Sequence, residues 1–341
     1  MSEPTPETLQ DRTGLAVAPD PKLELAPGFY PDLPWRVYHA LPYANSSTLK
    51  HFADSPYHAR HYMSHGDTDT DSKAYGRALH AWLLERDTFF DEVAVFEGVW
   101  RGMPKKTKAN PDGKPPSQAT RVEKRDGVQQ FLDPTLKTDD ARKAFVELEA
   151  RFATVIRDPD FARIKASAKI IEGQEAARYL LHDAPGYTEL TLIWDDSATG
   201  MRCKARLDRF VELGVGGKAW PTILDLKQLQ LATKEGVKRS AAALDWHVQA
   251  GFYCMGARAV FGAEHRFVHV TMEGDAPFAV LPVELDPLDI EQGERDARKY
   301  LDTWAECNAS GKWPVSELAI TPIDLPPWKR ARFSDEWGTF A

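Results

Sequence analysis

The sequence predicts an α/β fold with one core and additions at both ends of the chain. Helical periodicity dominates up to about residue 157, period-two alternation takes over from about residue 187, and a long helical pattern then separates two groups of strands. The chain has 341 residues, of which 43% are hydrophobic and 28% are charged. This composition is ordinary for a folded protein with a sizeable core.

The first half of the chain has mostly helical patterns, interrupted by two irregular stretches. Residues 1–36 are rich in proline and acidic residues, so we expect an extended or partly disordered tail. Residues 101–125 hold eight Lys or Arg against two acidic residues, which predicts a basic loop. The helical patterns, the first of them capped by Ser46 or Ser47, cover residues near 46–52, 55–63, 72–85 and about 139–157.

The second half begins with strands. Residues 187–196 and 201–212 alternate between apolar and polar side chains around the turn sequence SATG, which predicts a hairpin. A glycine-rich loop at 213–220 leads to a third strand, PTILDLK, at 221–227. The remaining patterns are a single helix over 240–262, strands over 265–273 and 278–285, and a last helix over 287–311.

These patterns divide the chain into three parts. Residues 1–36 form the tail, and residues 37–285 form a core that carries the basic loop 101–125 as an insert. Residues 286–341 form a C-terminal helix and a Trp- and Pro-rich tail, which we expect to pack on the core.

The net charge of −8 argues against a passive nucleic-acid coat but allows an enzyme with a local basic channel. No apolar run approaches the roughly 18–20 residues that span a bilayer, and the polar start MSEPTPETLQD does not resemble a signal peptide. We therefore expect a cytoplasmic protein without a membrane partner. The three cysteines, Cys203, Cys254 and Cys307, lie too far apart for a CxxC metal motif.

The strand pattern TILDLKQ, at 222–228, contains two charges that are costly to bury without partners. Alternation places Asp225 and Lys227 on one face, opposite Leu224 and Leu226. A bare pair of this kind is commonly an exposed strand pair of little energetic value. The rest of the pattern decides between that interpretation and a functional one.

A second acidic residue is predicted to meet the first. In the preceding strand, Asp208 shares a face with Arg206, and if the two strands are neighbours Asp208 and Asp225 converge. Two close carboxylates repel each other, and a divalent cation relieves the repulsion. Oxygen ligands favour Mg²⁺ or Mn²⁺. Lys227 would then lie beside the metal site, where it can orient a nucleophile and stabilise developing charge.

Further polar positions lie around these strands. His80 lies on a helix one turn after Gly76, which leaves room for a close approach. Glu189 opens the strand before the hairpin. Gln249 and Tyr253 are four residues apart and share one face of the helix that follows TILDLKQ.

Taken in order, these motifs resemble the PD-(D/E)XK nuclease superfamily, and more narrowly the RecE-type (exodeoxyribonuclease VIII) nuclease domain of phages and prophages. The resemblance covers about residues 38–260. It rests on GRALH (76–80), Glu189, RCKARLD (202–208), ILDLK (223–227), Gln249 and Tyr253, and SSTLKHFADSPYHARHY (46–62) fits the start of that domain. It implies a restriction-endonuclease-like core, a central mixed β-sheet flanked by helices, with N- and C-terminal extensions.

The resemblance also implies roles for individual residues. The metal ligands would be His80, Asp208, Asp225 and the backbone carbonyl of Leu226, and the metal would be Mg²⁺, with Mn²⁺ as a substitute. The catalytic lysine would be Lys227. Glu189 would act near the metals or on the DNA, and Gln249 with Tyr253 would hold a phosphate or the lysine. Gln228 departs from the threonine usual in the family, which puts local DNA contacts in doubt. Candidate DNA contacts are Arg77, Lys105, Lys106, Lys108 and Arg206.

The implied activity is Mg²⁺-dependent digestion of linear double-stranded DNA from its ends, 5′ to 3′. The remaining single strand would pass to a RecT-like annealing protein during recombination, the enzyme would form a homo-oligomer, and the host would be a bacterium carrying a phage or prophage.

Three alternatives stay open. One is a Cas4- or AddB-like nuclease, although such enzymes usually carry four cysteines for an iron–sulfur cluster. Another is a PD-(D/E)XK fold kept as a non-catalytic DNA-binding or assembly module. The last is an unrelated α/β domain whose motifs match by chance.

Overall fold

The computed structural model describes residues 24–66, 70–96, 148, 152, 154–215, 218–315, 320 and 322–325. Within these ranges a six-stranded sheet has the order β1-β4-β5-β6-β7-β8. The pair β6–β7 is parallel and the other neighbouring pairs are antiparallel. The strands are β1 (Gly28–Tyr30), β4 (Gly186–Asp195), β5 (Arg202–Val215), β6 (Lys218–Leu229), β7 (Arg266–Glu273) and β8 (Val280–Val283).

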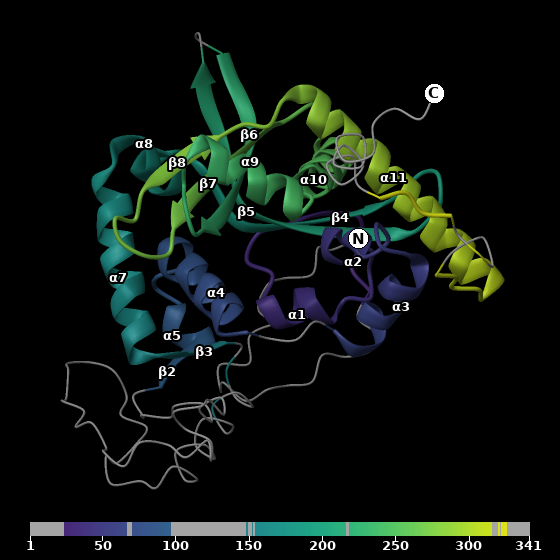
Figure 1. Cartoon of the computed structure of the whole chain (residues 1–341). Helices are drawn as coiled ribbons and strands as arrows, with labels where there is room; N and C mark the ends of the chain where they lie inside the picture. Colours follow the sequence, from purple (N-terminus) through teal and green to yellow (C-terminus); the bar gives the residue numbers. More distant parts are fainter. Residues whose placement is uncertain are drawn as a thin grey trace, which may run out of the picture.

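Helices cover both faces of this sheet (Figure 1). On one face, α10 (Trp246–Phe261), α11 (Pro287–Ser310) and α2 (Ser46–Lys50) share a hydrophobic core with β4 and β5. On the other, α4 (Asp71–Leu84) and α7 (Asp158–Gly173) pack against β6 and β7. The central mixed sheet flanked by helices, predicted from the sequence, is therefore confirmed.

Smaller elements complete the described chain. A short parallel pair, β2 (Val93–Phe96) and β3 (Thr154–Arg157), lies near α4 and α7. The other helices are α1 (Trp35–Ala40), α3 (Pro56–His65), α5 (Phe89–Glu92), α8 (Glu175–Arg178), the π-helical turn η2 (Tyr179–Asp183) and α9 (Lys234–Ala243). None of the helices in the described ranges is both long and apolar enough to cross a membrane.

The alternation predicted for TILDLKQ is present in β6. Ile223 packs in the core beneath α10, whereas Leu226 packs in the core beneath α4 and α7. Both side chains are essentially inaccessible to solvent. Because Asp225 and Lys227 share the face of Ile223, they point toward α10.

Three predicted elements differ from the structure. The helix predicted over 139–157 is wrong at its end, because residues 154–157 form β3, whose side chains are mostly buried against β2. The glycine-rich loop predicted at 213–220 is also wrong, since β5 runs to Val215 and β6 begins at Lys218. The single helix predicted over 240–262 is two helices, α9 and α10, separated at Asp245, whose φ of 48° is left-handed.

Part of the segment predicted as an N-terminal tail belongs to the sheet. β1 lies within residues 1–36, where we expected an extended tail, and it pairs with β4 at the edge of the sheet. Residues 1–23 and the basic insert 101–125 lie outside the described residues.

Helices α10 and α11 approach so closely that two glycines are required at their crossing. A Cβ atom at Gly293 would lie 1.8 Å from the backbone oxygen of His247, and one at Gly251 would lie 2.3 Å from the backbone nitrogen of Glu294. Backbone atoms cannot rotate away as a side chain can, so either substitution must move a whole helix.

We therefore expect Gly293→Ala to lower the free energy of unfolding by about 1–3 kcal/mol, the usual range for overpacking. Gly173→Ala is the matched control, because a Cβ atom at Gly173 in α7 meets no atom within 4 Å. Urea unfolding of both variants measures the difference. Equal stabilities for the two variants would show that α10 and α11 do not pack as described.

Candidate active site

The centre of the site is the pair Asp225 and Lys227 on β6, joined by Gln249 from α10. The Asp225 carboxylate is 2% exposed, and Lys227 Nζ lies 2.6 Å from its Oδ2. Gln249 Nε2 donates to Asp225 Oδ1 at 2.9 Å, and Gln249 Oε1 accepts from Lys227 Nζ at 3.1 Å. One amide therefore fixes the positions of both charged groups. The Lys227 ammonium also lies 5.9 Å from the Trp246 ring.

Asp208 reaches the same point from β5. The register of β5 with β6 runs from Val215↔Lys218 to Arg209↔Leu224, and Asp208 is the next residue beyond it. There Asp208 Oδ2 accepts a hydrogen bond from the Leu226 N–H at 2.6 Å, and His80 Nδ1 of α4 lies 3.6 Å from the same oxygen. Since the N–H and carbonyl of one strand residue point to the same side, the Leu226 carbonyl also faces Asp208.

The pKa values of Asp208 and Asp225 are shifted in opposite directions. Burial raises the pKa of Asp208 well above its usual value, and the neighbouring Asp225 and Glu189 charges raise it further. Burial acts in the same direction on Asp225, but Lys227, His269 and His80 together outweigh it and hold the pKa of Asp225 below its usual value. Burial lowers the pKa of His80, which keeps its imidazole neutral and able to bind a metal.

Glu189 lies inside β4, three residues after the strand begins, in a left-handed conformation with φ of 51°. The pairs Thr188↔Arg209 and Leu190↔Leu207 flank it, so Glu189 and Asp208 interrupt the regular register together. Non-glycine residues rarely adopt this conformation, and when they do it is often at functional sites.

Arg206, a predicted DNA contact, and Tyr253, the predicted companion of Gln249, have different surroundings. Arg206 donates to Glu189 Oε2 and, at 2.8 Å, to the Leu33 carbonyl, and its side chain is 10% exposed. Tyr253 is buried, which raises the pKa of its hydroxyl. The structure thus brings His80, Asp208, Asp225, Lys227 and Gln249 together and places Tyr253 behind them.

The structure describes only two of the five predicted DNA contacts, Arg77 and Arg206. Arg77 donates to Thr154 Oγ1 at 2.9 Å, on the side of the small β2–β3 sheet. Lys105, Lys106 and Lys108 lie outside the described residues. The role of all of these residues in DNA binding, like that of Arg206, stays a prediction.

Gly76 is less constrained than the sequence suggested. A Cβ atom there would meet Gln228 Oε1 at 3.6 Å, an ordinary contact distance. The close approach occurs instead at Gly274, after β7, where a Cβ atom would lie 2.1 Å from Gln228 Nε2.

The sequence analysis missed His269, which lies opposite Asp225 in the β6–β7 register. Its ring is fully buried, its Nε2 is 3.9 Å from Asp225 Oδ2, and neither ring nitrogen has a hydrogen-bond partner within the described ranges. It stacks on Trp246 at 4.9 Å. The signal was available, because His269 is a polar residue in an apolar strand, as Asp225 is.

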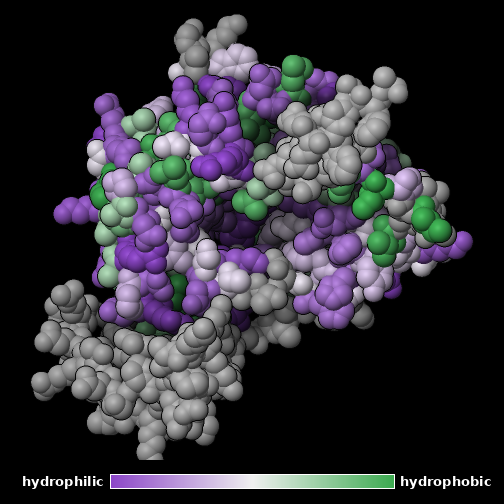
Figure 2. Space-filling view, viewed as in Figure 1, coloured by the Kyte–Doolittle hydropathy of each residue, from purple (hydrophilic) through white to green (hydrophobic). Residues whose placement is uncertain are grey.

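The described side chains do not include a group of three or more His, Cys, Asp and Glu residues arranged to hold a metal ion. The Asp225 and Asp208 oxygens that would bind a cation face Lys227 and the Leu226 N–H instead. The face of the molecule in Figure 2 is hollowed near its centre, and hydrophilic residues line the hollow.

Two solved structures are similar to parts of the chain. No curated protein matches the chain. A solved protein from Eubacterium rectale that bears the provisional name of an exonuclease is 12% identical, over 83% of this chain and 91% of that one, with a TM-score of 0.49. The structure of a protein named SSO0001 is 13% identical, over 48% of this chain and 65% of that one, with a TM-score of 0.25. At TM-scores below 0.5 neither similarity carries a functional argument.

The family comparison covers most of the chain. The model of the "PDDEXK-like domain of unknown function (DUF3799)" matches residues 45–319, which contain the strands β5 and β6 and the helices α4 and α10 that face them. The order of elements and the side chains that converge on β6 fit that description. The chain belongs to this PDDEXK-like family.

Proposed function

We propose that this protein is a metal-dependent DNA nuclease whose active site is formed by His80, Asp208, Asp225 and Lys227. The observation that carries the proposal is the convergence of two desolvated carboxylates from neighbouring strands beside a lysine that α10 holds in place. Buried like charges are costly in a purely structural role, and such clusters mark functional sites.

The donor set fits a hard divalent cation such as Mg²⁺ or Mn²⁺. Two carboxylates and the Leu226 carbonyl offer oxygen, and neutral His80 adds one imidazole nitrogen. Asp225 Oδ2 is buried and, within the described residues, accepts no hydrogen bond, although Lys227 lies beside it. A bound cation would supply charge that stabilises the pentavalent phosphate and the leaving oxygen.

The residues of the chain itself have separable tasks. Gln249 keeps Lys227 next to Asp225, so the ammonium can turn toward a phosphate oxygen or hold a water molecule in line with the phosphorus. The pKa of Asp208 is raised, so a cation bound beside this carboxyl group would lower that pKa and favour its ionised form. The covering helices α10 and α2 exclude bulk water from the inner side of the site.

The more specific form of the proposal is an exonuclease. It would digest linear double-stranded DNA 5′ to 3′ and leave a single strand for an annealing protein. The RecE-like order of the motifs supports this form, as does their placement in one site. A homo-oligomeric state and a bacterial cytoplasm with phage or prophage origin belong to the same proposal.

The test is digestion of linear duplex DNA carrying a 5′ label, in Mg²⁺, with closed circular DNA of the same sequence as control. We expect short labelled products from the linear DNA and an intact circle. Cleavage of the circle would replace the exonuclease with an endonuclease. No cleavage of either DNA in Mg²⁺ or Mn²⁺ would remove the nuclease proposal.

A further inference from the structure

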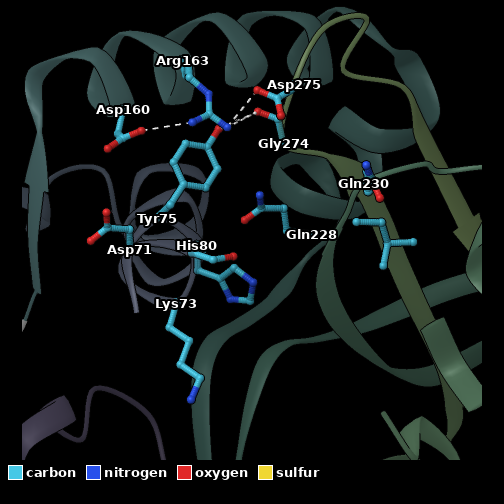
Figure 3. Close-up of a pocket in the computed structure, with 13 residues that line it drawn as sticks. Asp71, Lys73, Tyr75, His80, Asp160, Arg163, Gln228, Gln230, Gly274 and Asp275 are labelled. Atoms are coloured by element: carbon cyan, nitrogen blue, oxygen red, sulfur yellow. Dashed lines mark hydrogen bonds and ion pairs between the residues drawn. The ribbon is translucent and has the colours of Figure 1, made fainter. Parts of the chain in front are cut away.

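A pocket of about 490 Å³ opens beside the candidate active site, with His80 in its wall. The pocket lies between the first half of α4, the start of α7, the end of β6 and the turn after β7, and the close-up shows its lining (Figure 3). The volume falls in the lower part of the range of small-molecule sites, which is roughly 300–1,000 Å³. Whatever occupies this pocket is adjacent to the proposed cleavage point.

Gln228 projects into the middle of this pocket, between His80 on one side and Arg163 and Gly274 on the other (Figure 3). Its amide has no hydrogen-bond partner among the described residues. In its present position the amide needs the space that Gly274 leaves, since a Cβ atom there would lie 2.1 Å from Gln228 Nε2. The pocket therefore presents an amide donor and an amide acceptor that make no hydrogen bond within the described residues.

The wall beyond Gln228 is rigid. The Arg163 guanidinium lies over the Tyr75 ring at 4.5 Å. It is held there by Asp160 at 3.0 Å, by Asp275 at 2.9 Å and by the Gly274 carbonyl at 3.1 Å. The Arg163 side chain is still 39% exposed. A planar cation pinned on one face and open to solvent at its remaining surface is a surface on which a nucleobase stacks.

The charge of the lining selects against a phosphate. Its ionised side chains are three carboxylates and two cations, which leaves one negative charge in excess: Asp71, Asp160, Asp275, Lys73 and Arg163. Two of the carboxylates already neutralise Arg163. A site with this balance repels an anion and accepts an uncharged polar group.

We propose that this pocket binds the base and sugar of one unpaired nucleotide next to the phosphodiester that is cut. Gln228 contacts the edge of the base, and Arg163 stacks on its face. This inference rests on the proposed nuclease function. It adds that the enzyme holds this nucleotide by its base rather than by its phosphate.

The test uses linear duplexes labelled at the 3′ end of the digested strand, in which one residue of that strand lacks its base, moved one position at a time from the 5′ end. We expect cleavage by the full chain in Mg²⁺ to slow roughly 5- to 100-fold at the bond adjacent to the missing base, compared with the same bond in intact DNA. Gln228→Ala should cut intact DNA more slowly and lose most of this difference. Gly274→Ala should behave in the same way, because its methyl group displaces the Gln228 amide.

The matched control is Gln292→Ala, which removes an exposed amide on α11 and should keep the full difference. If the full chain cleaves DNA but no position responds to the missing base, or if the Gln228 and Gly274 variants respond as the parent does, the pocket does not bind a base, and the nuclease proposal stands. If the full chain cleaves no DNA at all, the nuclease proposal fails and takes this inference with it.

Discussion

Asp225→Asn is expected to reduce DNA cleavage by roughly a thousandfold or more, since a developing charge in a buried site loses the group that places the compensating cation. The substitution keeps the size of the side chain and its acceptor for Gln249 Nε2, but it removes the negative charge beside Lys227. Two measurements are needed: single-turnover cleavage in Mg²⁺, and Mn²⁺ binding followed by the loss of the free-ion paramagnetic signal. Both should fall together.

The matched control is Asp302→Asn on α11, where the carboxylate is half exposed and pairs with Arg298. It should leave cleavage and Mn²⁺ binding unchanged. Circular dichroism and thermal unfolding would show whether the Asp225 variant is folded. A folded Asp225→Asn variant that cuts DNA as fast as the parent chain would exclude Asp225 from the site.

Lys227→Met is expected to have a different signature. Cleavage should fall about 10²- to 10⁴-fold, the range seen when a positioned proton-transfer or charge-stabilising group is removed. Mn²⁺ binding should persist or become tighter, because the ammonium that lies 2.6 Å from Asp225 Oδ2 no longer competes with the metal for that oxygen. Methionine keeps most of the aliphatic length of lysine near Trp246.

Lys238→Met is the matched control, since this lysine of α9 is 75% exposed and forms only an (i, i+3) pair with Glu235. It should behave as the parent chain does. Loss of Mn²⁺ binding in the folded Lys227 variant would contradict the assignment, because it would make the lysine a structural support of the carboxylates instead of a catalytic group.

The fold class and the centre of the site were accessible to sequence reasoning because β6 follows a simple rule. Alternation in TILDLKQ fixed the faces of Asp225 and Lys227, whereas the place of Gln249 beside the lysine was implied only by the family resemblance. The expectation for Asp208 required β5 and β6 to be neighbours, which they are, but the register of β5 with β4 is interrupted at Asp208.

The failures share a different cause. The break before α10 depends on a left-handed Asp245, and the interruption of the β4–β5 register depends on a left-handed Glu189. Asp adopts this conformation only occasionally and Glu rarely, so the sequence does not predict either position. Residues 154–157 form a strand only because β2 lies beside them, so a tertiary contact overrides a helical pattern. His269 is recognisable in the sequence as a polar residue in an apolar strand, but its place beside Asp225 follows only from the pairing of β7 with β6.

The parallel pairing of β6 with β7 has a consequence for synthesis. Asp225 and Lys227 leave the ribosome well before Gln249 of α10 and His269 of β7, and parallel strands can pair only after the crossover between them has been made. A nascent chain that ends before residue 273 therefore holds its acidic residues on an edge strand without the groups that orient them. Non-local contacts of this kind form slowly. We therefore expect the site to be completed late in folding, after α10 and β7 have been synthesised.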